Sequence, residues 1–190
     1  MIIDENLLLE NGAVYRNYSA KEIIYLSGDT AHYYFQIVEG IVELNNYHED
    51  GKEFTQNILS DGQSFGESLL FSDKKYPTNA IARTDCKILK LRKSDFLKML
   101  VENKNLIVTL FKHLSDRLFN KYIMLFSNSS LDPVSKIKSL LDYHKEGSMS
   151  RKKYSFKVPF TRQQIANLTG MWVETVIRTI KKWSRKTLSK

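Results

Sequence analysis

The chain has 190 residues, of which 42% are hydrophobic and 12% aromatic, and it carries a formal net charge of +8. This composition supplies enough apolar side chains for a packed core, so it excludes an intrinsically disordered chain. No apolar run is long enough to cross a membrane, and one cysteine, Cys86, can form neither an internal disulfide nor a cysteine-rich metal or iron–sulfur site.

The charge is divided unequally along the chain. Residues 1–132 hold 15 Lys and Arg against 18 Asp and Glu, a balance of −3, whereas residues 133–190 hold 14 against 3, a balance of +11. A small basic module favours a polyanionic partner, usually nucleic acid, although a solvated lysine-rich surface is the alternative. The first residues include acids and no base before Arg16, unlike a secretory signal, so we expect a cytoplasmic protein with no membrane partner.

Residues 1–93 are predicted to form an effector-sensing β-roll, a double-stranded β-helix of the jelly-roll kind. Between residues 18 and 91, short apolar and aromatic segments alternate with glycines, four of which follow one another at spacings of 12, 11 and 11. Short strands at regular spacing are typical of sandwiches and barrels. The expected strands lie in 23–26, 33–38, 41–44 and 54–59, with a hairpin turn at 48–53 and further strand-like alternation over 79–91.

A long dimerisation helix is predicted over residues 94–127. Ser94 is expected at the N-cap with Asp95 in the first turn. Beyond Leu106, apolar residues recur at three- and four-residue steps, so one stripe of the helix can pair with a second copy in coiled-coil fashion. The alternative is a helix that only covers its own β-roll. The dimer stripe is assigned to Ile107, Leu110, Phe111, Leu114, Leu118, Tyr122 and Leu125.

The basic module is predicted to begin after a hinge at 128–133, NSSLDP, because this polar segment precedes a further amphipathic helix and marks the change in charge balance. Residues 134–190 are then expected to form a helix-turn-helix DNA-binding domain. Thr161 and Gln164 fit a capping box at the start of one helix. Gly170 supplies the tight turn to the next helix.

The second helix of this pair has two different sides. Val176, Ile180 and Trp183 share an apolar side, and the opposite side is mostly charged. Such a charged side can enter the major groove, where arginine pairs with guanine and glutamate accepts a hydrogen bond from cytosine. The alternative is a helical hairpin with a solvated charged face. DNA contacts are assigned to Thr161, Arg162, Gln163, Trp172, Val173, Glu174, Thr175, Arg178, Lys181 and Lys182.

The segments GDTAHYYFQIVEGIVEL (28–44), DGQSFGESLLF (61–71) and TRQQIANLTGMWVETVIRTIKK (161–182) together resemble the CRP/FNR family of bacterial transcription regulators, over roughly residues 15–183. The resemblance implies an α+β homodimer whose winged helix reads a two-fold symmetric DNA site, with RNA polymerase as a further partner. It also implies base contacts at Val173, Glu174 and Arg178. Because Val173 stands where the family often has arginine, contact there would be apolar, for instance to a thymine methyl.

The resemblance further implies a pocket for a small-molecule effector. In cyclic-AMP-binding members a glycine and a glutamate, here Gly66 and Glu67, hold the ribose, and an Arg-Ser pair grips the phosphate. That pair falls at Tyr76, Pro77 and Thr78, where tyrosine and proline supply no cation, so a cyclic nucleotide is not expected. Lys74 and Lys75 would be flexible point charges. The pocket is assigned to Phe65, Gly66, Glu67, Ser68, Thr78 and Asn79.

The cysteines and histidines of the chain also bear on which other cofactors and functions we expect. The iron–sulfur branch of the family needs a cysteine cluster that this chain lacks, whereas haem stays open because His32, His48, His113 and His144 are present. An enzyme on a cupin-like barrel would need two or three histidines around a metal; no H-x-H occurs, so neither an enzyme nor a metal site is expected. The remaining alternative is a ligand-sensing module that acts through protein contacts and binds nucleic acid only non-specifically.

The expected DNA-binding domain departs from the family at its end. Seven residues, SRKTLSK, follow Trp183, and a wing hairpin needs a longer segment. A short or missing wing is therefore predicted, either because this member lacks one or because the polypeptide is shortened.

Overall fold

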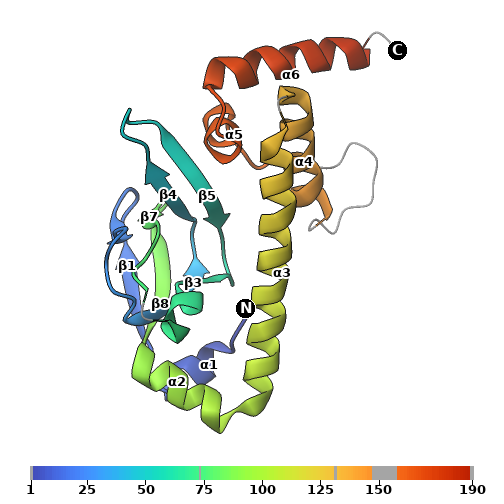
Figure 1. The fold of residues 1–190 in the computed structure, drawn as a ribbon. Helices are drawn as coiled ribbons and strands as arrows, with labels where there is room; N and C mark the ends of the chain where they lie inside the picture. The colour runs from blue at the N-terminus through green and yellow to red at the C-terminus, as the bar shows by residue number, and fades with distance from the viewer. Residues whose placement is uncertain (1, 73, 131, 147–157, 189–190) are drawn as a thin grey trace. The chain divides into compact units, whose positions relative to one another are not determined.

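The computed structural model describes residues 2–72, 74–130, 132–146 and 158–188 (Figure 1). The chain divides into two compact units, Met1–Ser115 and Asp116–Lys190, and the division lies within the long helix α3 (Lys104–Ser129). Among the described residues, no helix combines the length and the apolar character that crossing a membrane requires.

The first unit is a sandwich of two antiparallel four-stranded sheets, as the predicted β-roll requires. A short helix, α1 (Glu5–Glu10), precedes the strands, and a 3-10 helix, η1 (Glu67–Phe71), follows β6. One sheet has the order β1 (Val14–Tyr18), β8 (Cys86–Arg92), β3 (Tyr33–Glu39) and β6 (Ser64–Phe65); the other has the order β2 (Ile23–Tyr25), β7 (Asn79–Ala82), β4 (Val42–Tyr47) and β5 (Glu53–Leu59).

The sheets enclose the core because apolar residues alternate along the strands. Val42 and Ala82 face each other across β4 and β7 and are fully buried. The predicted hairpin at 48–53 is confirmed: the His48 N–H donates to the Lys52 carbonyl oxygen at 2.9 Å. Gly40 has φ 108°, and a Cβ there would lie 2.6 Å from the Asp85 oxygen, so only glycine fits this junction.

The predicted helix over 94–127 is divided between two helices, α2 (Lys93–Glu102) and α3. The expected Ser94 cap is wrong: α2 begins at Lys93, and the Ser94 hydroxyl donates to Asp95 instead. The break falls at Asn103, whose backbone N–H and side-chain Nδ2 both donate to the Met99 carbonyl oxygen, at 3.0 and 2.9 Å. These two bonds occupy the last turn of α2 and end it.

The second unit contains the end of α3 and three further helices, α4 (Pro133–Glu146), α5 (Arg162–Thr169) and α6 (Val173–Leu188). Asp132 accepts hydrogen bonds from the Ser135 hydroxyl and from the backbone N–H groups of Ser135 and Val134, and so caps α4; these bonds lower the pKa of its carboxyl group. The core of this unit consists of Ile137, Leu140, Ile165, Ala166, Leu168 and Val176.

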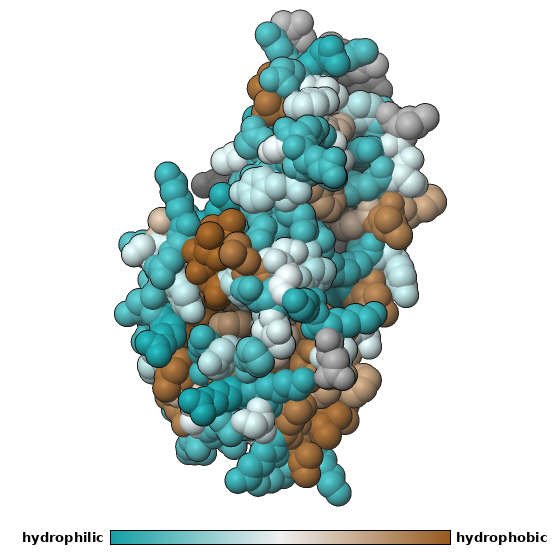
Figure 2. All heavy atoms as spheres, turned by 60° about the vertical axis from the view of Figure 1, so that its left-hand side comes forward, coloured by the Kyte–Doolittle hydropathy of each residue, from teal (hydrophilic) through white to brown (hydrophobic). Residues whose placement is uncertain are grey.

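Apolar side chains also reach the surface of the molecule. Figure 2 shows separate groups of hydrophobic residues among hydrophilic ones on one face. Single exposed apolar residues are ordinary in folded proteins. Exposure therefore marks a candidate site only where several apolar side chains share one side of one element.

Candidate nucleic-acid interface and effector pocket

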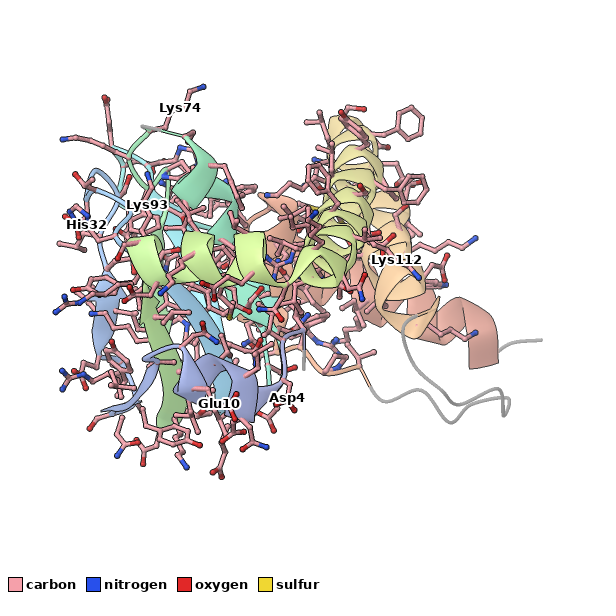
Figure 3. The ribbon with its side chains drawn as sticks, turned by 90° about the horizontal axis from the view of Figure 1, so that it is seen from below. Asp4, Glu10, His32, Lys74, Lys93 and Lys112 are labelled. Atoms are coloured by element: carbon pink, nitrogen blue, oxygen red, sulfur yellow. The ribbon has the colours of Figure 1, made fainter. Side chains whose placement is uncertain are left out.

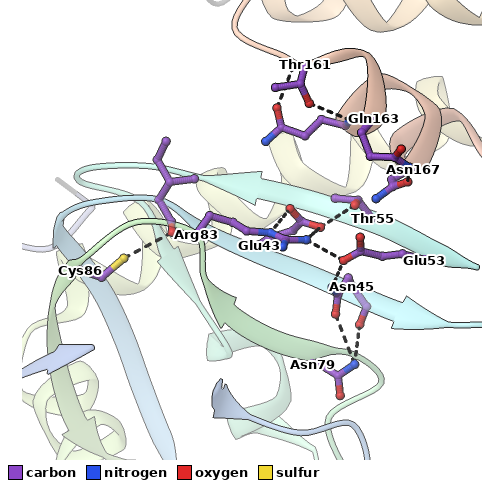
Figure 4. A network of polar contacts seen from close by, with 12 residues as sticks. Glu43, Asn45, Glu53, Thr55, Asn79, Arg83, Cys86, Thr161, Gln163 and Asn167 are labelled. Atoms are coloured by element: carbon purple, nitrogen blue, oxygen red, sulfur yellow. Dashed lines mark hydrogen bonds and ion pairs between the residues drawn. The ribbon is translucent and has the colours of Figure 1, made fainter. Parts of the chain in front are cut away.

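The start of α5 has the capping box predicted from the sequence. The Thr161 hydroxyl accepts a hydrogen bond from the Gln164 N–H at 3.1 Å, and the Gln164 side chain accepts one from the Thr161 N–H at 2.9 Å (Figure 4). Each bond satisfies a backbone donor that the first turn of a helix leaves without a partner. The N-terminus of α5 is therefore fixed by local chemistry.

The turn between α5 and α6 has a left-handed glycine at its centre. Gly170 has φ 67° and ψ 15°, and its N–H donates to the Ala166 carbonyl oxygen. The Met171 N–H reaches the same oxygen at 3.0 Å. A residue that has a side chain is destabilised in this left-handed conformation, whereas glycine adopts it freely. Gly170 therefore allows the two helices to meet through a short connection.

Helix α6 has one buried and one exposed side. Val176 is fully buried and Thr179 nearly so, whereas Ile180 and Trp183 are half-buried. On the other side Glu174, Arg178, Lys181 and Lys182 are exposed. The sequence-based expectation of a two-sided helix is thus met, and the exposed side carries three cations and one acid.

Glu174 and Arg178 lie one helical turn apart on that side. Neither side chain forms a hydrogen bond or an ion pair with another residue in the described part of the chain. Their polar groups are therefore available to an external partner, and a carboxylate beside a guanidinium can meet a donor on one base and acceptors on another.

The remaining predicted DNA contacts occupy the starts of the two helices. Thr161, Arg162 and Gln163 are exposed at the beginning of α5, and the Gln163 side chain donates to Asn167 at 2.8 Å (Figure 4). Trp172 is 63% exposed just before α6. Val173 and Thr175 are partly buried.

One exposed residue of α6 was missed by the sequence-based assignment. Ile177 is 49% exposed and lies on the same side of the helix as the charged residues. A rotation of 100° per residue places it between Val173 and Lys181, so the sequence did contain the information that identifies it.

A buried tyrosine lies beside Gly66 of the predicted effector pocket. Gly66 has φ 81°, and a Cβ at that position would lie 3.4 Å from the Tyr76 hydroxyl. Tyr76 is 4% exposed, and its ring stacks on that of Tyr25 with a centroid separation of 3.7 Å. The space beside Gly66, where the resemblance places a phosphate-binding cation, therefore holds an aromatic side chain of the protein itself.

The electrostatics around Tyr76 do not suit an anion. Burial raises the pKa of Tyr76 to about 12, and the negative charges of Asp29 and Glu67 contribute in the same direction. The phenol is thus neutral at physiological pH, and Glu67 is itself buried. Lys74 and Lys75 are exposed, and Figure 3 shows the Lys74 side chain projecting away from the ribbon.

The other residues assigned to the pocket differ in their exposure. Phe65 is fully buried in the core, with its ring stacked on Phe35 at 5.0 Å. Thr78 is buried, Ser68 is exposed, and Asn79 donates to Asn45.

A polar network that the sequence did not reveal lies in the second sheet. Arg83 donates from Nε and Nη2 to the buried carboxylate of Glu43 at 2.6 and 2.7 Å, and from Nη2 to Glu53 at 2.6 Å (Figure 4). The Thr55 hydroxyl donates to Glu43 at 2.7 Å. Because its members bond to one another, this network stabilises the fold.

The histidines do not form a metal site in the part of the chain that the structure describes, where no group of three or more His, Cys, Asp or Glu could hold an ion. His32 and His48 are exposed, and His113 is partly buried. The side chain of His144 lies outside the described residues.

Comparison with known proteins finds a matching domain family for each part of the chain. Residues 15–103 match the cyclic nucleotide-binding domain, and residues 137–190 match the Crp-like helix-turn-helix domain. The chain is 26% identical over 166 residues to the cAMP-activated global transcriptional regulator CRP of Haemophilus influenzae, covering 86% of this chain and 74% of that protein. It is also 26% identical over 171 residues to the regulator Vfr of Pseudomonas aeruginosa, covering 87% and 80%.

A solved structure shares the fold. The c-di-GMP-responsive regulator CLP of Xanthomonas campestris superposes with a TM-score of 0.74 at 20% identity, covering 97% of this chain and 94% of that one.

Proposed function

The chain belongs to the CRP/FNR family of DNA-binding transcription regulators, and from this premise we propose that it acts as a homodimer on a specific, two-fold symmetric DNA site. The observation that carries the proposal is α6, where Glu174 and Arg178 are exposed above a packed helix-turn-helix core. Arg178 would pair with a guanine, Glu174 would accept from a cytosine, and Lys181 and Lys182 would meet phosphates.

The homodimer would form along the exposed stripe of α3. Val108, Phe111, Leu118, Tyr122 and Leu125 are between 50% and 72% exposed and recur at heptad-like steps. Side chains of this size lose contact with water when two such helices pair, which stabilises the dimer. The stripe is narrower than the one predicted: Leu110 is buried in the core of its own β-roll, and Ile107 and Leu114 pack against that core.

Two α6 helices related by the dimer axis would occupy successive major grooves, about 34 Å apart along the duplex. Thr161, Arg162 and Gln163 would contact the phosphate backbone at the start of α5. In this arrangement the phosphate contacts set the position of the dimer and α6 selects the sequence.

The effector would differ from a cyclic nucleotide. The CRP of Haemophilus influenzae is named as cAMP-activated. In this chain the stacked ring of Tyr76 fills the space beside Gly66, which supports a different small molecule or a protein contact as the controlling input. The protein would work in the cytoplasm, with RNA polymerase as its partner in transcription.

Control would be a shift in population between two orientations of the helix-turn-helix about residues 128–133. Asn128, at the end of α3, donates to the Leu168 carbonyl oxygen of α5 at 3.3 Å. A displacement of the end of α3 would therefore be transmitted to α5, while the Asp132 cap holds the start of α4.

The proposal is tested by selecting binding sites from random duplex DNA with the full chain and measuring affinity for the enriched site. We expect a palindromic site, and we expect Arg178→Ala to lose about 1–3 kcal/mol of binding free energy and to relax discrimination at one base pair. Lys98→Ala, which removes an exposed cation of α2, is the matched control and should bind like the wild type.

The alternative function, a ligand-sensing module with only non-specific nucleic-acid affinity, predicts another result. In that case no sequence is enriched, and the wild type and Arg178→Ala bind unrelated duplexes equally well. Sedimentation that finds a monomer at every concentration, with or without DNA, would also contradict the proposal.

A further inference from the structure

The exposed side of α6 is not uniformly charged. Four residues advance an α-helix by about 40° beyond one full turn, so Val173 and Ile177 form one line along the helix and Glu174 and Arg178 form a second line beside it. Trp172 directly precedes Val173, at the start of α6. Trp172 and Ile177 are 63% and 49% exposed.

The fold of its own unit does not explain the exposed Ile177. The buried side of α6 is already occupied by Val176 and Thr179. Ile177 is β-branched, so its exposed position gains neither core burial nor high helix propensity. Its hydrophobic surface is left in contact with water.

Trp172 stands where helices favour a different side chain. Its carbonyl oxygen accepts from the Thr175 N–H at 3.0 Å and from the Val176 N–H at 3.2 Å, so it holds the position just before the first turn of α6. Ser, Thr, Asp and Asn are preferred there because a side-chain oxygen can accept from the helix. An indole has a donor and no acceptor, so Trp172 forgoes this stabilisation.

We infer that Trp172, Val173 and Ile177 form an apolar edge of α6 that recognises thymine C5-methyl groups in the major groove. The inference rests on the proposed function and specifies which bases the site must contain. The C5-methyl of thymine is the apolar feature that base edges present in the major groove, so an apolar edge on a groove-reading helix selects it.

This edge lies beside the line of Glu174 and Arg178. A half-site read by both lines would therefore combine one or two thymines with a neighbouring G·C pair. Specificity would arise from two kinds of contact: hydrogen bonds from the polar line and burial of methyl groups by the apolar edge. Cytosine methylated at C5 presents the same methyl group, so a pair of 5-methylcytosine with guanine should be accepted at those positions in place of a thymine·adenine pair.

The test removes single methyl groups from the DNA. In the duplex enriched by selection, each thymine is replaced in turn by deoxyuridine, which lacks the C5-methyl, and the Kd of the full chain is measured by fluorescence anisotropy at fixed salt. At one or two positions in each half-site we expect affinity to fall about fourfold, the effect of losing one buried methyl-sized group. Replacements elsewhere should have no effect.

Variants connect the methyl groups to the edge. Ile177→Ala and Trp172→Ala should each bind the thymine duplex more weakly and lose sensitivity to deoxyuridine at one position. Lys182→Ala should bind both duplexes more weakly by the same factor, because a phosphate contact does not sense the base. The wild-type measurement stands by itself if a variant fails to fold.

The possible outcomes test the inference and the proposed function separately. If no site is enriched, the proposed function fails. If a site is enriched and deoxyuridine is tolerated at every position, the function stands and the inference is wrong. Unchanged deoxyuridine sensitivity in both apolar variants would also overturn the assignment of the edge.

Discussion

The two units use similar side chains in opposite ways. Beside Gly66 in the β-roll, Glu67 and Tyr76 are buried, and the ring of Tyr76 stacks on that of Tyr25, so the fold encloses polar groups that could meet a ligand. On α6, Glu174 and Arg178 stand on a packed helix and remain exposed. The comparison shows that a sequence motif can specify a turn of the backbone without specifying a binding site. A binding site also requires polar side chains that the fold leaves exposed.

The largest expected effect compares the loss of a buried phenylalanine in the β-roll with the loss of an exposed phenylalanine on α3. Phe65→Ala should lower the free energy of unfolding by about 3–5 kcal/mol, because it leaves a cavity in the core. Phe111→Ala is the matched control, since Phe111 is 66% exposed and its loss should cost the isolated chain under about 1 kcal/mol. Urea unfolding of both variants at low protein concentration distinguishes them, and similar costs would contradict the contrast.

A smaller effect is expected for the polar network of the β-roll. Arg83→Ala leaves the buried Glu43 carboxylate without its bidentate partner. Because Arg83 is partly exposed, we expect the free energy of unfolding to fall by about 2 kcal/mol, between the values for surface and buried ion pairs. Lys98→Ala removes an exposed ion pair with Glu102 at 3.8 Å and should cost less than about 0.5 kcal/mol. Thermal unfolding of the two variants measures the difference, and equal shifts would argue against burial as its cause.

The helix-turn-helix unit offers a comparison that depends on local chemistry. Thr161→Ala removes a capping acceptor and should destabilise this unit by about 1 kcal/mol. Thr109 bonds the Asn105 carbonyl oxygen within α3, so Thr109→Ala keeps all backbone hydrogen bonds and should be nearly neutral. Amide hydrogen exchange in α5 reports the cap directly; unaltered exchange in Thr161→Ala would refute its role.

The smallest effect at neutral pH concerns Tyr76. Its hydroxyl lies 3.5 Å from the Tyr33 carbonyl oxygen, so Tyr76→Phe should change stability by less than about 0.5 kcal/mol. Above pH 10 the two proteins should diverge. Burial raises the pKa of Tyr76 in the folded state to about 12. The neutral phenol therefore contributes fully to the free energy of unfolding below pH 10, and this contribution is lost as the pH rises toward 12.

Tyrosine absorbance provides the measurement. A step near pH 12 should be present in the wild type and absent from Tyr76→Phe. Ionisation of all ten tyrosines near pH 10 in the folded wild type would show that the ring is not enclosed.

Much of the helix-turn-helix could be predicted from the sequence, because its determinants lie close together in the chain. The capping box joins residues three apart, Gly170 fixes its own turn, and the two sides of α6 follow from the helical period. The strands of the β-roll were predicted for the same reason. The Ser94 cap failed because α2 begins at Lys93, whose N–H donates to the carbonyl oxygen of His32, a residue distant in the chain.

The sequence by itself determined which elements form and which of their sides are apolar, since propensity, period and capping act over a few residues. Only the tertiary structure decided that Leu110 faces its own core, that Arg83 joins Glu43 and that Tyr76 closes the space beside Gly66. The Arg83–Glu43 and Tyr76–Tyr33 contacts join residues 40 and 43 positions apart. Such contacts exist only after strands distant in the chain have paired and packed, which no local pattern specifies.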